Sequence, residues 1–292
     1  MKKKKVFIIA EAGINHNGSL KKAFKMIDLA KDAGADAIKF QTFHHSDIAV
    51  IKAPLAKYQK NKKIKDQINL LKKLELTHNS QKKIRKYCLK KKISFLSSAF
   101  DINSLRFLRS LNQKVFKIPS GEITNLPYLS ELGRYNKFVL LSTGASTINE
   151  IKFAINTLVK NGTKRKNITV LHCNSEYPTP FNDANLNSIE YLKKILKLNV
   201  GYSDHTLGIE ASIAAVAKGA SVIEKHFTLN KSYAGPDHQA SITPIELKEL
   251  VRSLRNIEKA LLVNKKIVTK SEKKNIKIIR KSIVAKSHIK KN

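Results

Sequence analysis

Short apolar runs alternate with amphipathic stretches along most of this 292-residue chain. Eight runs rich in Val, Ile, Leu and Phe have the length of β-strands and occupy residues 5–11, 36–42, 94–100, 115–121, 138–144, 169–175, 199–205 and 222–228. Stretches with helical periodicity separate or follow them, at 19–33, 79–91, 102–111, 126–134, 147–161, 186–197, 208–218 and 243–263. Eight β–α units in strict alternation predict an α/β fold with a closed parallel sheet, the TIM (β/α)8 barrel.

Three helices carry start signals, at Asp101, at Ser146, and at Thr243 followed by Pro244. The alternation is interrupted by a long, polar and basic insertion at 43–78, which we expect to form an active-site loop with some helix. After residue 263 the pattern changes again. We therefore expect a catalytic barrel over 1–263 and a short C-terminal extension over 264–292, a basic linker that leads into a truncated second unit.

Lysine dominates the composition, since 56 Lys and Arg against 22 Asp and Glu give a net charge of +34. The lysines are spread over nearly every segment and rarely interleave with aromatic residues, which favours solvated helix faces over a nucleic-acid-binding surface. Cys88 and Cys173 lack a CxxC spacing and indicate reduced thiols. The N-terminal apolar run stops at Glu11, too early for a signal peptide, and no segment has the length of a membrane span. A soluble cytoplasmic protein is expected.

Polar residues gather where the predicted strands end. In a (β/α)8 barrel these ends form one face, and that face carries the active site. The residues concerned are Glu11, Lys39, Gln41, Ser97, Ser98, Lys117, Ser120, Glu122, Ser142, Thr143, Asn174, Ser175, Tyr177, Ser203, Asp204, His205, Glu224, Lys225 and His226.

Two histidines, His205 and His226, end consecutive predicted strands. Neighbouring strands lie about 5 Å apart, so both imidazoles could bind one divalent cation such as Mn²⁺, Fe²⁺ or Zn²⁺. A pair of hydrogen-bonded barrel histidines is the alternative. The nearby acids Asp204, Glu224 and Glu11 favour the metal.

Two lysines, Lys39 and Lys117, lie within predicted strands. A buried ammonium group needs an anion or loses its proton, so the lysines and the surrounding serines predict a site for a ligand with a phosphate and a carboxylate. Structural pairing of Lys39 with Glu11 and of Lys117 with Glu122 is the alternative. Schiff-base chemistry is a further possibility for a barrel lysine, but the serines and the metal site favour ion binding.

A loop carboxylate, Glu122, follows the turn "SGE" and could act as a general base or bind a sugar hydroxyl, unless it is simply solvated. The segment "AEAGINHNG" lacks the GxGxxG spacing, which argues against a dinucleotide site.

Seven segments together resemble the sialic acid synthase family: "IAEAGINHNGSL", "AIKFQTF", "FKIPSGEITNLPYL", "LLSTGAS", "LHCNSEYPTPF", "VGYSDHTLGIEAS" and "VIEKHFTLNKSYAGPDHQAS". The resemblance covers about residues 1–285. It implies a transferase that condenses phosphoenolpyruvate (PEP) with an N-acylated mannosamine to give a nonulosonic acid for cell-surface polysaccharide. "EITNLPYL" and "HCNSEYPTPF" are most similar to the branch that makes N,N′-diacetyllegionaminate.

The resemblance also implies roles for individual residues. His205 and His226 would hold a divalent metal, Mn²⁺ before Mg²⁺ or Co²⁺. The PEP carboxylate would meet Lys39, Ser98 and Ser203. The PEP phosphate would meet Lys117, Ser120, Ser142 and Ser175, the last standing where the sialate branch has Asn. The sugar and the reacting carbons would meet Glu11, Gln41, Glu122, Tyr177 and Asp237.

Members of this family continue into a small antifreeze-like (SAF) domain that caps the partner's barrel in a swapped dimer and supplies an Arg. "IIRKSIVAKSHIKKN" resembles the first residues of that domain, so we expect the capping Arg to be absent and the homodimer to be weakened or altered. Two other readings stay open. One is an N-acetylneuraminate synthase that uses N-acetylmannosamine. The other is an inactive barrel without its cap that binds nucleic acid or another partner.

Overall fold

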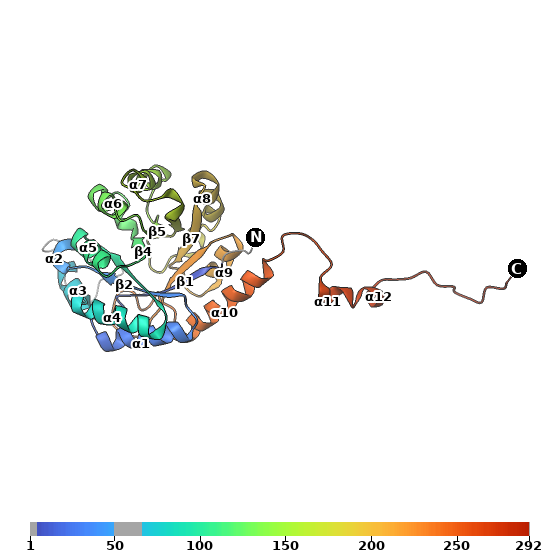
Figure 1. The fold of residues 1–292 in the computed structure, drawn as a ribbon. Coiled ribbons are helices and arrows are strands. Elements are labelled where there is room, and N and C mark those ends of the chain that lie inside the picture. Colours follow the sequence, from blue (N-terminus) through green and yellow to red (C-terminus); the bar gives the residue numbers. More distant parts are fainter. Residues whose placement is uncertain (1–4, 50–65, 292) are drawn as a thin grey trace.

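Eight parallel strands close into one barrel in a computed structural model, which describes residues 5–49 and 66–291 (Figure 1). Each strand pairs with the next along the chain, and β8 pairs with β1, so the predicted TIM barrel is confirmed. The strands are β1 (Phe7–Gly13), β2 (Ala37–Thr42), β3 (Ser94–Ala99), β4 (Val115–Ile118), β5 (Phe138–Ser142), β6 (Ile168–His172), β7 (Asn199–Asp204) and β8 (Val222–His226).

An outer ring of helices follows the strands as the periodicity predicts (Figure 1). Its members are α1 (Leu20–Asp32), α4 (His78–Lys91), α5 (Ile102–Ser110), α6 (Leu126–Gly133), α7 (Ile148–Lys160), α8 (Ser188–Leu196), α9 (Glu210–Ala217) and α10 (Pro244–Ala260). Asp101 and Thr243 cap their helices as expected. The start predicted at Ser146 is one residue early, because Thr147 is the N-cap and forms a capping box with Glu150.

Side chains that point into the barrel form two layers, because alternate residues of a strand face the same side. The lower layer is apolar and contains Ile9, Ala37, Leu96, Leu140, Leu171 and Val222. Two positions further along the same strands come Glu11, Lys39, Ser98, Ser142, Cys173 and Glu224, all of which line a cavity above that layer. The apolar layer therefore closes the barrel from below, and the polar residues next to it are held on rigid strands.

The insertion at 43–78 contains two helices within its described residues, α2 (His45–Ile48) and α3 (Gln67–Leu74). Residues 50–65 of this segment lie outside the described part of the chain. Ile14, Phe43, Leu70 and Leu74 form a separate apolar cluster that packs α3 against the top of the barrel. The insertion thus adds a wall to one side of the mouth.

The C-terminal extension leaves the barrel after α10 and reaches away from it (Figure 1). It contains two short helices, α11 (Lys270–Lys273) and α12 (Ile276–Ile279), and its residues are almost all exposed.

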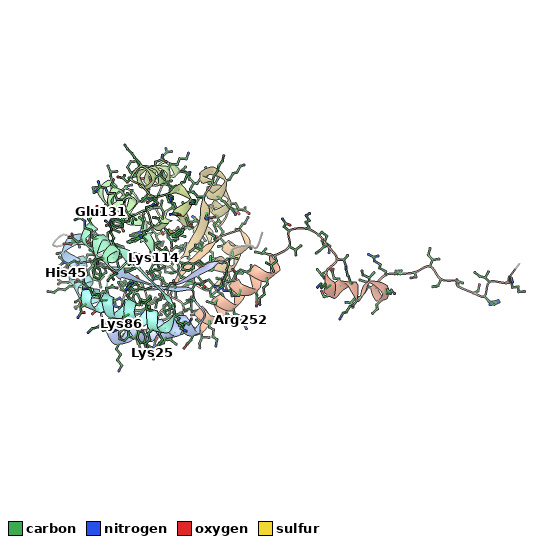
Figure 2. All side chains as sticks on the ribbon, viewed as in Figure 1. Lys25, His45, Lys86, Lys114, Glu131 and Arg252 are labelled. Carbon is green, nitrogen blue, oxygen red and sulfur yellow. The ribbon has the colours of Figure 1, made fainter. Side chains whose placement is uncertain are left out.

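Lysines elsewhere cover the outer helices. Lys25 of α1 and Lys86 of α4 are exposed there, as Figure 2 shows. Cys88 and Cys173 are unpaired and buried. Among the described residues, no helix combines the length and the apolarity that crossing a bilayer demands.

Candidate active site

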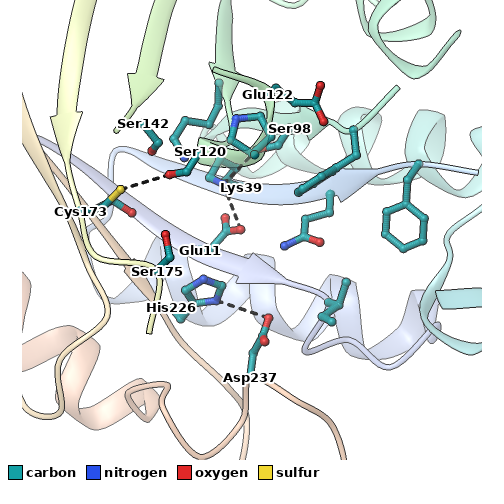
Figure 3. A pocket seen from close by; sticks show the side chains of 18 of the residues that line it. Glu11, Lys39, Ser98, Ser120, Glu122, Ser142, Cys173, Ser175, His226 and Asp237 are labelled. Atoms are coloured by element: carbon teal, nitrogen blue, oxygen red, sulfur yellow. Dashed lines mark hydrogen bonds and ion pairs between the residues drawn. The ribbon is translucent and has the colours of Figure 1, made fainter. Parts of the chain in front are cut away.

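The mouth of the barrel holds a cavity of about 590 Å³ at the C-terminal ends of the strands. All fourteen residues for which the family resemblance implies a role line it, from Glu11 of β1 to Asp237 beyond β8. Figure 3 shows side chains of 18 of the lining residues around this space and labels ten of them. The geometry brings the candidates together, while their individual roles stay predictions.

An ion network crosses the floor of the cavity. Lys39 Nζ lies 3.0 Å from Glu11 Oε1 and 3.6 Å from Glu224 Oε2, and it donates to Ser98 Oγ at 3.0 Å (Figure 3). Glu224 Oε1 accepts from Lys117 Nζ at 3.2 Å and from Ser203 Oγ at 2.9 Å. Glu224 thus joins both lysines. The sequence analysis noted this residue only as an acid near the histidines.

Burial and neighbouring charges set the pKa values of this network. Burial raises the pKa of Glu11 to about 7, although the Lys39 ammonium group opposes the shift. Burial alone would also raise the pKa of Glu224, but Lys117 and Lys39 outweigh it and hold that pKa well below its usual range. Burial would lower the pKa of Lys39, yet Glu11 and Glu224 raise it overall. Lys39 and Glu224 are therefore charged at neutral pH, whereas Glu11 can gain or lose a proton there.

The alternative pairing of Lys117 with Glu122 is wrong, because Lys117 binds Glu224 instead. Glu122 lies in the short 3₁₀ helix η2 (Ser120–Glu122), and its Oε2 accepts from Asn125 Nδ2 at 2.6 Å. Half-burial raises the pKa of this carboxyl group. Glu122 therefore stands apart from the lysines, on the loop that borders the cavity.

Hydroxyl groups line the side of the cavity at Gly144. Gly144 N–H donates to Ser120 Oγ at 2.9 Å, and Ser120 Oγ lies 3.4 Å from Cys173 Sγ (Figure 3). A Cβ at Gly144 would lie 2.4 Å from Ser175 Oγ and 2.9 Å from Ser120 Oγ, so only glycine allows the hydroxyls to approach this backbone. Ser142 Oγ is buried beside them and has no hydrogen-bond partner among the described residues. Such a group is what a phosphate oxygen would satisfy.

The two histidines meet where β7 and β8 end, with ring centroids 5.6 Å apart. His205 Nδ1 hydrogen-bonds to the carbonyl oxygen of Asn174 at 2.5 Å, which assigns the proton to Nδ1. The lone pair of Nε2 then faces Tyr177 Oη, 3.1 Å away. His226 Nδ1 lies 3.9 Å from Asp237 Oδ2 and has no hydrogen-bond partner among the described residues (Figure 3).

Metal binding requires neutral imidazoles, and burial supplies them. It lowers the pKa of His205 to about 4, and burial together with His205 and Lys39 lowers the pKa of His226 well below its usual range. Burial raises the pKa of Asp237 to about 6. A backbone carbonyl that orients one imidazole is also the usual outer contact of a metal-bound histidine. The residues therefore fit a divalent cation.

Five residues that the sequence placed on the rim do not line the cavity as the described residues define it: Ser97, Thr143, Asn174, Asp204 and Lys225. Asp204 had been expected beside the metal, but its side chain points away from the cavity and pairs with Lys225 Nζ at 2.8 Å. Ser97 Oγ lies 2.7 Å from Thr42 Oγ1, outside the barrel interior. Both follow from the strand period of two, which sends neighbours of an inward-facing residue outward.

A second group of possible ligands, His44, His45 and Glu75, has atoms within 4.8 Å of one another on the insertion. Glu75 Oε2 already accepts from the backbone N–H of His45 at 3.0 Å and lies 2.7 Å from His45 Nδ1. His44 is exposed, and none of the three lines the cavity as the described residues define it. The geometry thus favours His205 and His226 for a metal that takes part in chemistry.

The outer wall of the cavity is apolar and was not anticipated. Its side chains come from the loops after the first three strands and from the insertion: Ile14, Phe43, Ile48, Leu71 and Phe100. Phe43 and Phe100 pack edge to face with centroids 6.4 Å apart. Position directly after a strand could have identified Phe43 and Phe100. Nothing in the local sequence marks Leu71 as a lining residue.

Comparison with known proteins agrees with this architecture. A model of the NeuB family matches residues 26–266. N,N′-diacetyllegionaminic acid synthase of Campylobacter jejuni is 53% identical over 99% of this chain and 87% of its own length. The synthase of the same name from Legionella pneumophila is 42% identical over 95% and 79%.

A solved structure gives the same result. The crystal structure of N-acetylneuraminic acid (sialic acid) synthetase from Leptospira borgpetersenii, in complex with citrate, superposes with a TM-score of 0.82 at 36% identity and covers 94% of this chain and 91% of that one. The predicted resemblance, including the similarity to legionaminate synthases, is confirmed, and the chain belongs to the NeuB family.

Proposed function

We propose that this enzyme is a PEP-dependent nonulosonic acid synthase that joins PEP to an N-acylated mannosamine-type sugar and releases phosphate. The observation that carries the proposal is the arrangement of two lysines, five serines and two neutral histidines around one cavity at the barrel mouth. The names of the relatives, legionaminic acid and sialic acid synthases, support the same reaction class.

The donor end of the cavity is suited to a three-carbon dianion or trianion. Lys39 and Ser98, 3.0 Å apart, and Ser203 would bind the carboxylate. Lys117, Ser120, Ser142 and Ser175 would bind the phosphate, helped by the backbone at Gly144. Fixed cationic and hydroxyl groups hold the donor in one orientation and offset charge that develops as phosphate leaves.

A divalent cation, Mn²⁺ before Mg²⁺ or Co²⁺, would be held by His205 and His226 and would supply Lewis acidity toward the sugar aldehyde. Carbon 3 of PEP forms the new bond to the aldehyde carbon, whose oxygen takes a proton and becomes a hydroxyl group. Water adds at carbon 2 and gives up a proton, and the C2–O bond to phosphate then breaks, so that phosphate leaves with the second proton and carbon 2 becomes a ketone. Glu11 would take a proton from that water, and its pKa, which burial raises to about 7, supports this role. Gln41, Glu122, Tyr177 and Asp237 would bind the sugar hydroxyl and amide groups.

The acceptor we propose is 2,4-diacetamido-2,4,6-trideoxymannose, which would give N,N′-diacetyllegionaminate. Two observations support it. The Campylobacter relative with 53% identity bears the name of that synthase. The apolar wall of Phe43, Leu71 and Phe100 also suits methyl groups, which this sugar carries on carbon 6 and on both acetamido groups, better than hydroxyls.

We further propose that residues 1–263 form the catalytic barrel and that 264–292 comprise a basic linker and the first residues of a SAF-like unit. We expect a homodimer, which mass measurement in solution will test.

The test is a panel of acceptors supplied with PEP and Mn²⁺. We expect phosphate release and a nine-carbon product of matching mass with the diacetamido sugar, and at least tenfold lower kcat/KM with N-acetylmannosamine. Equal use of both sugars would refute the acceptor assignment. No phosphate release with any acylated amino sugar would refute the reaction class.

A further inference from the structure

Asp204 and Lys225 form a buried ion pair behind the wall of the cavity. The two residues occupy neighbouring strands, β7 and β8, each one position before a candidate metal ligand. Both side chains are about 1% exposed or less, and neither lines the cavity among the described residues. The pair therefore lies outside the proposed active site. It is connected to that site through the backbone of the two histidines.

The carboxylate of Asp204 is fully engaged. Its Oδ1 accepts from the backbone N–H of Thr206 at 2.9 Å and from Thr206 Oγ1 at 2.7 Å. Its Oδ2 accepts from Ser212 Oγ of α9 at 2.6 Å and from Lys225 Nζ at 2.8 Å. Lys225 Nζ also donates to the carbonyl oxygen of Thr206 at 2.9 Å.

These contacts hold the backbone on both sides of His205. On its C-terminal side, the N–H of Thr206 donates to Asp204 and the carbonyl oxygen of Thr206 accepts from Lys225. On its N-terminal side lies Asp204 itself. The same ammonium group belongs to the residue next to His226. One buried cluster thus ties together the backbone positions from which both imidazoles project.

Packing alone gives little reason for such a pair. Burying two charges costs desolvation that an apolar pair of similar volume avoids, and replacing buried ion pairs by apolar residues is often neutral for stability. What the charges add is a connected set of hydrogen bonds between β7, β8 and α9, and a fully satisfied buried network of this kind makes its surroundings rigid.

We propose that Asp204 and Lys225 are positioning residues that set the relative placement of the His205 and His226 imidazoles and thereby the affinity for the metal. The inference rests on the proposed function in that these histidines bind a divalent cation. Loss of a hydrogen-bond partner of a metal-bound histidine typically weakens metal binding about 10- to 100-fold. We expect an effect of that order here, although the pair acts through the backbone, since its hydrogen bonds among the described residues go to Thr206 and Ser212 and not to either imidazole.

The experiment compares Mn²⁺ binding by electron paramagnetic resonance in the wild-type chain and in Lys225→Met, Asp204→Asn and Ser212→Ala. Arg255→Met is the matched control. It breaks a pair at the opposite end of the barrel, where Arg255 Nη2 lies 2.6 Å from Asp36 Oδ2. We expect about 10- to 100-fold weaker Mn²⁺ binding for the first two variants and about fivefold for Ser212→Ala, the equivalent of one hydrogen bond. The control should bind within twofold of wild type, and excess Mn²⁺ should restore phosphate release in Lys225→Met.

Wild-type Mn²⁺ affinity in a folded Lys225→Met or Asp204→Asn protein would overturn this inference and leave the proposed function unaffected. Should both variants fail to fold, unchanged affinity in Ser212→Ala would overturn it. If the wild-type chain binds no Mn²⁺, the inference falls together with the metal site. If the Arg255→Met control weakens Mn²⁺ as strongly as Lys225→Met, the effect is one of general stability and the inference is likewise overturned.

Discussion

Glu224 offers the sharpest perturbation, because one carboxylate satisfies both buried lysines. Glu224→Gln keeps the shape of the side chain and removes its charge. In the wild-type chain Glu224 oxygens lie 3.2 Å from Lys117 Nζ and 3.6 Å from Lys39 Nζ, with all three side chains at most 6% exposed. Lys39 retains Glu11 as a partner, whereas Lys117 loses the carboxylate with which it pairs among the described residues.

The expected change in the free energy of unfolding follows from these distances. At an effective dielectric constant of about 20, each of the two charge pairs attracts by about 5 kcal/mol. Relief from burying the carboxylate offsets part of this, and glutamine can still accept from Ser203. Breaking a buried pair costs about 3–5 kcal/mol in measured cases, so we expect the free energy of unfolding to fall by about 3 kcal/mol. In a domain of this size that loss lowers Tm by about 6–12 °C.

Glu224→Gln should also increase the stabilisation of the protein by PEP. Without Glu224 the two ammonium groups have one anion less, and PEP supplies two. Thermal unfolding with and without PEP and Mn²⁺ should therefore give a larger PEP-induced rise of Tm in Glu224→Gln than in the wild type. Glu131→Gln is the control, since its ionic partners Arg106 and Arg134 are exposed and glutamine can still accept from Tyr135 Oη. It should cost about 1 kcal/mol at most.

A Glu224→Gln protein as stable as the wild type would refute the proposed network. So would a PEP-induced rise of Tm no larger than in the wild type, because it would mean that the lysines do not bind the donor.

Three further predictions concern other parts of the barrel. Gly144→Ala should raise KM for PEP about tenfold or more, measured by phosphate release, because its Cβ would displace the Ser175 and Ser120 hydroxyls; an unchanged KM would remove them from the phosphate site. Gly201→Ala should lower the free energy of unfolding by about 3 kcal/mol in denaturant titration, since its Cβ would lie 2.6 Å from a carbonyl oxygen of β8. Burial lowers the pKa of His16 to about 4, so the unfolded chain binds its proton first and stability is lost as pH falls from about 6.5 toward 4. His16→Gln should recover about 3 kcal/mol of that loss between the unfolding curves at pH 7 and pH 4, and equal curves for both proteins would contradict the assignment.

The barrel was predictable because the strand period and the helix period can both be recognised in short stretches of sequence. Apolar runs of strand length and helical stretches alternate eight times, and that order allows few other folds. The position of the site was predictable for the same reason, since strand ends such as those at Lys39 and His226 converge on one face. The strands end one to three residues earlier than predicted in most cases, because polar residues such as Ser120 and Ser175 turn out of the ladder into loops.

Partnerships within the site were less predictable. Lys117 could have bound Glu122 or Glu224, and only the closure of the barrel brings β4 opposite β8. The orientation of Asp204 depends on whether its strand ends before or after it, and a shift of one residue reverses the face. Leu71 reaches the cavity through packing of an insertion, a long-range contact that periodicity does not report.

Phosphate release from PEP in the presence of Mn²⁺ and the diacetamido sugar, compared between the wild type and the variants His205→Ala and His226→Ala, tests the central claim most directly. The wild type should release phosphate in step with product, and each variant should lose the Mn²⁺-dependent rate while staying folded. Full Mn²⁺-dependent turnover in both variants would contradict the claim that these two imidazoles hold the metal.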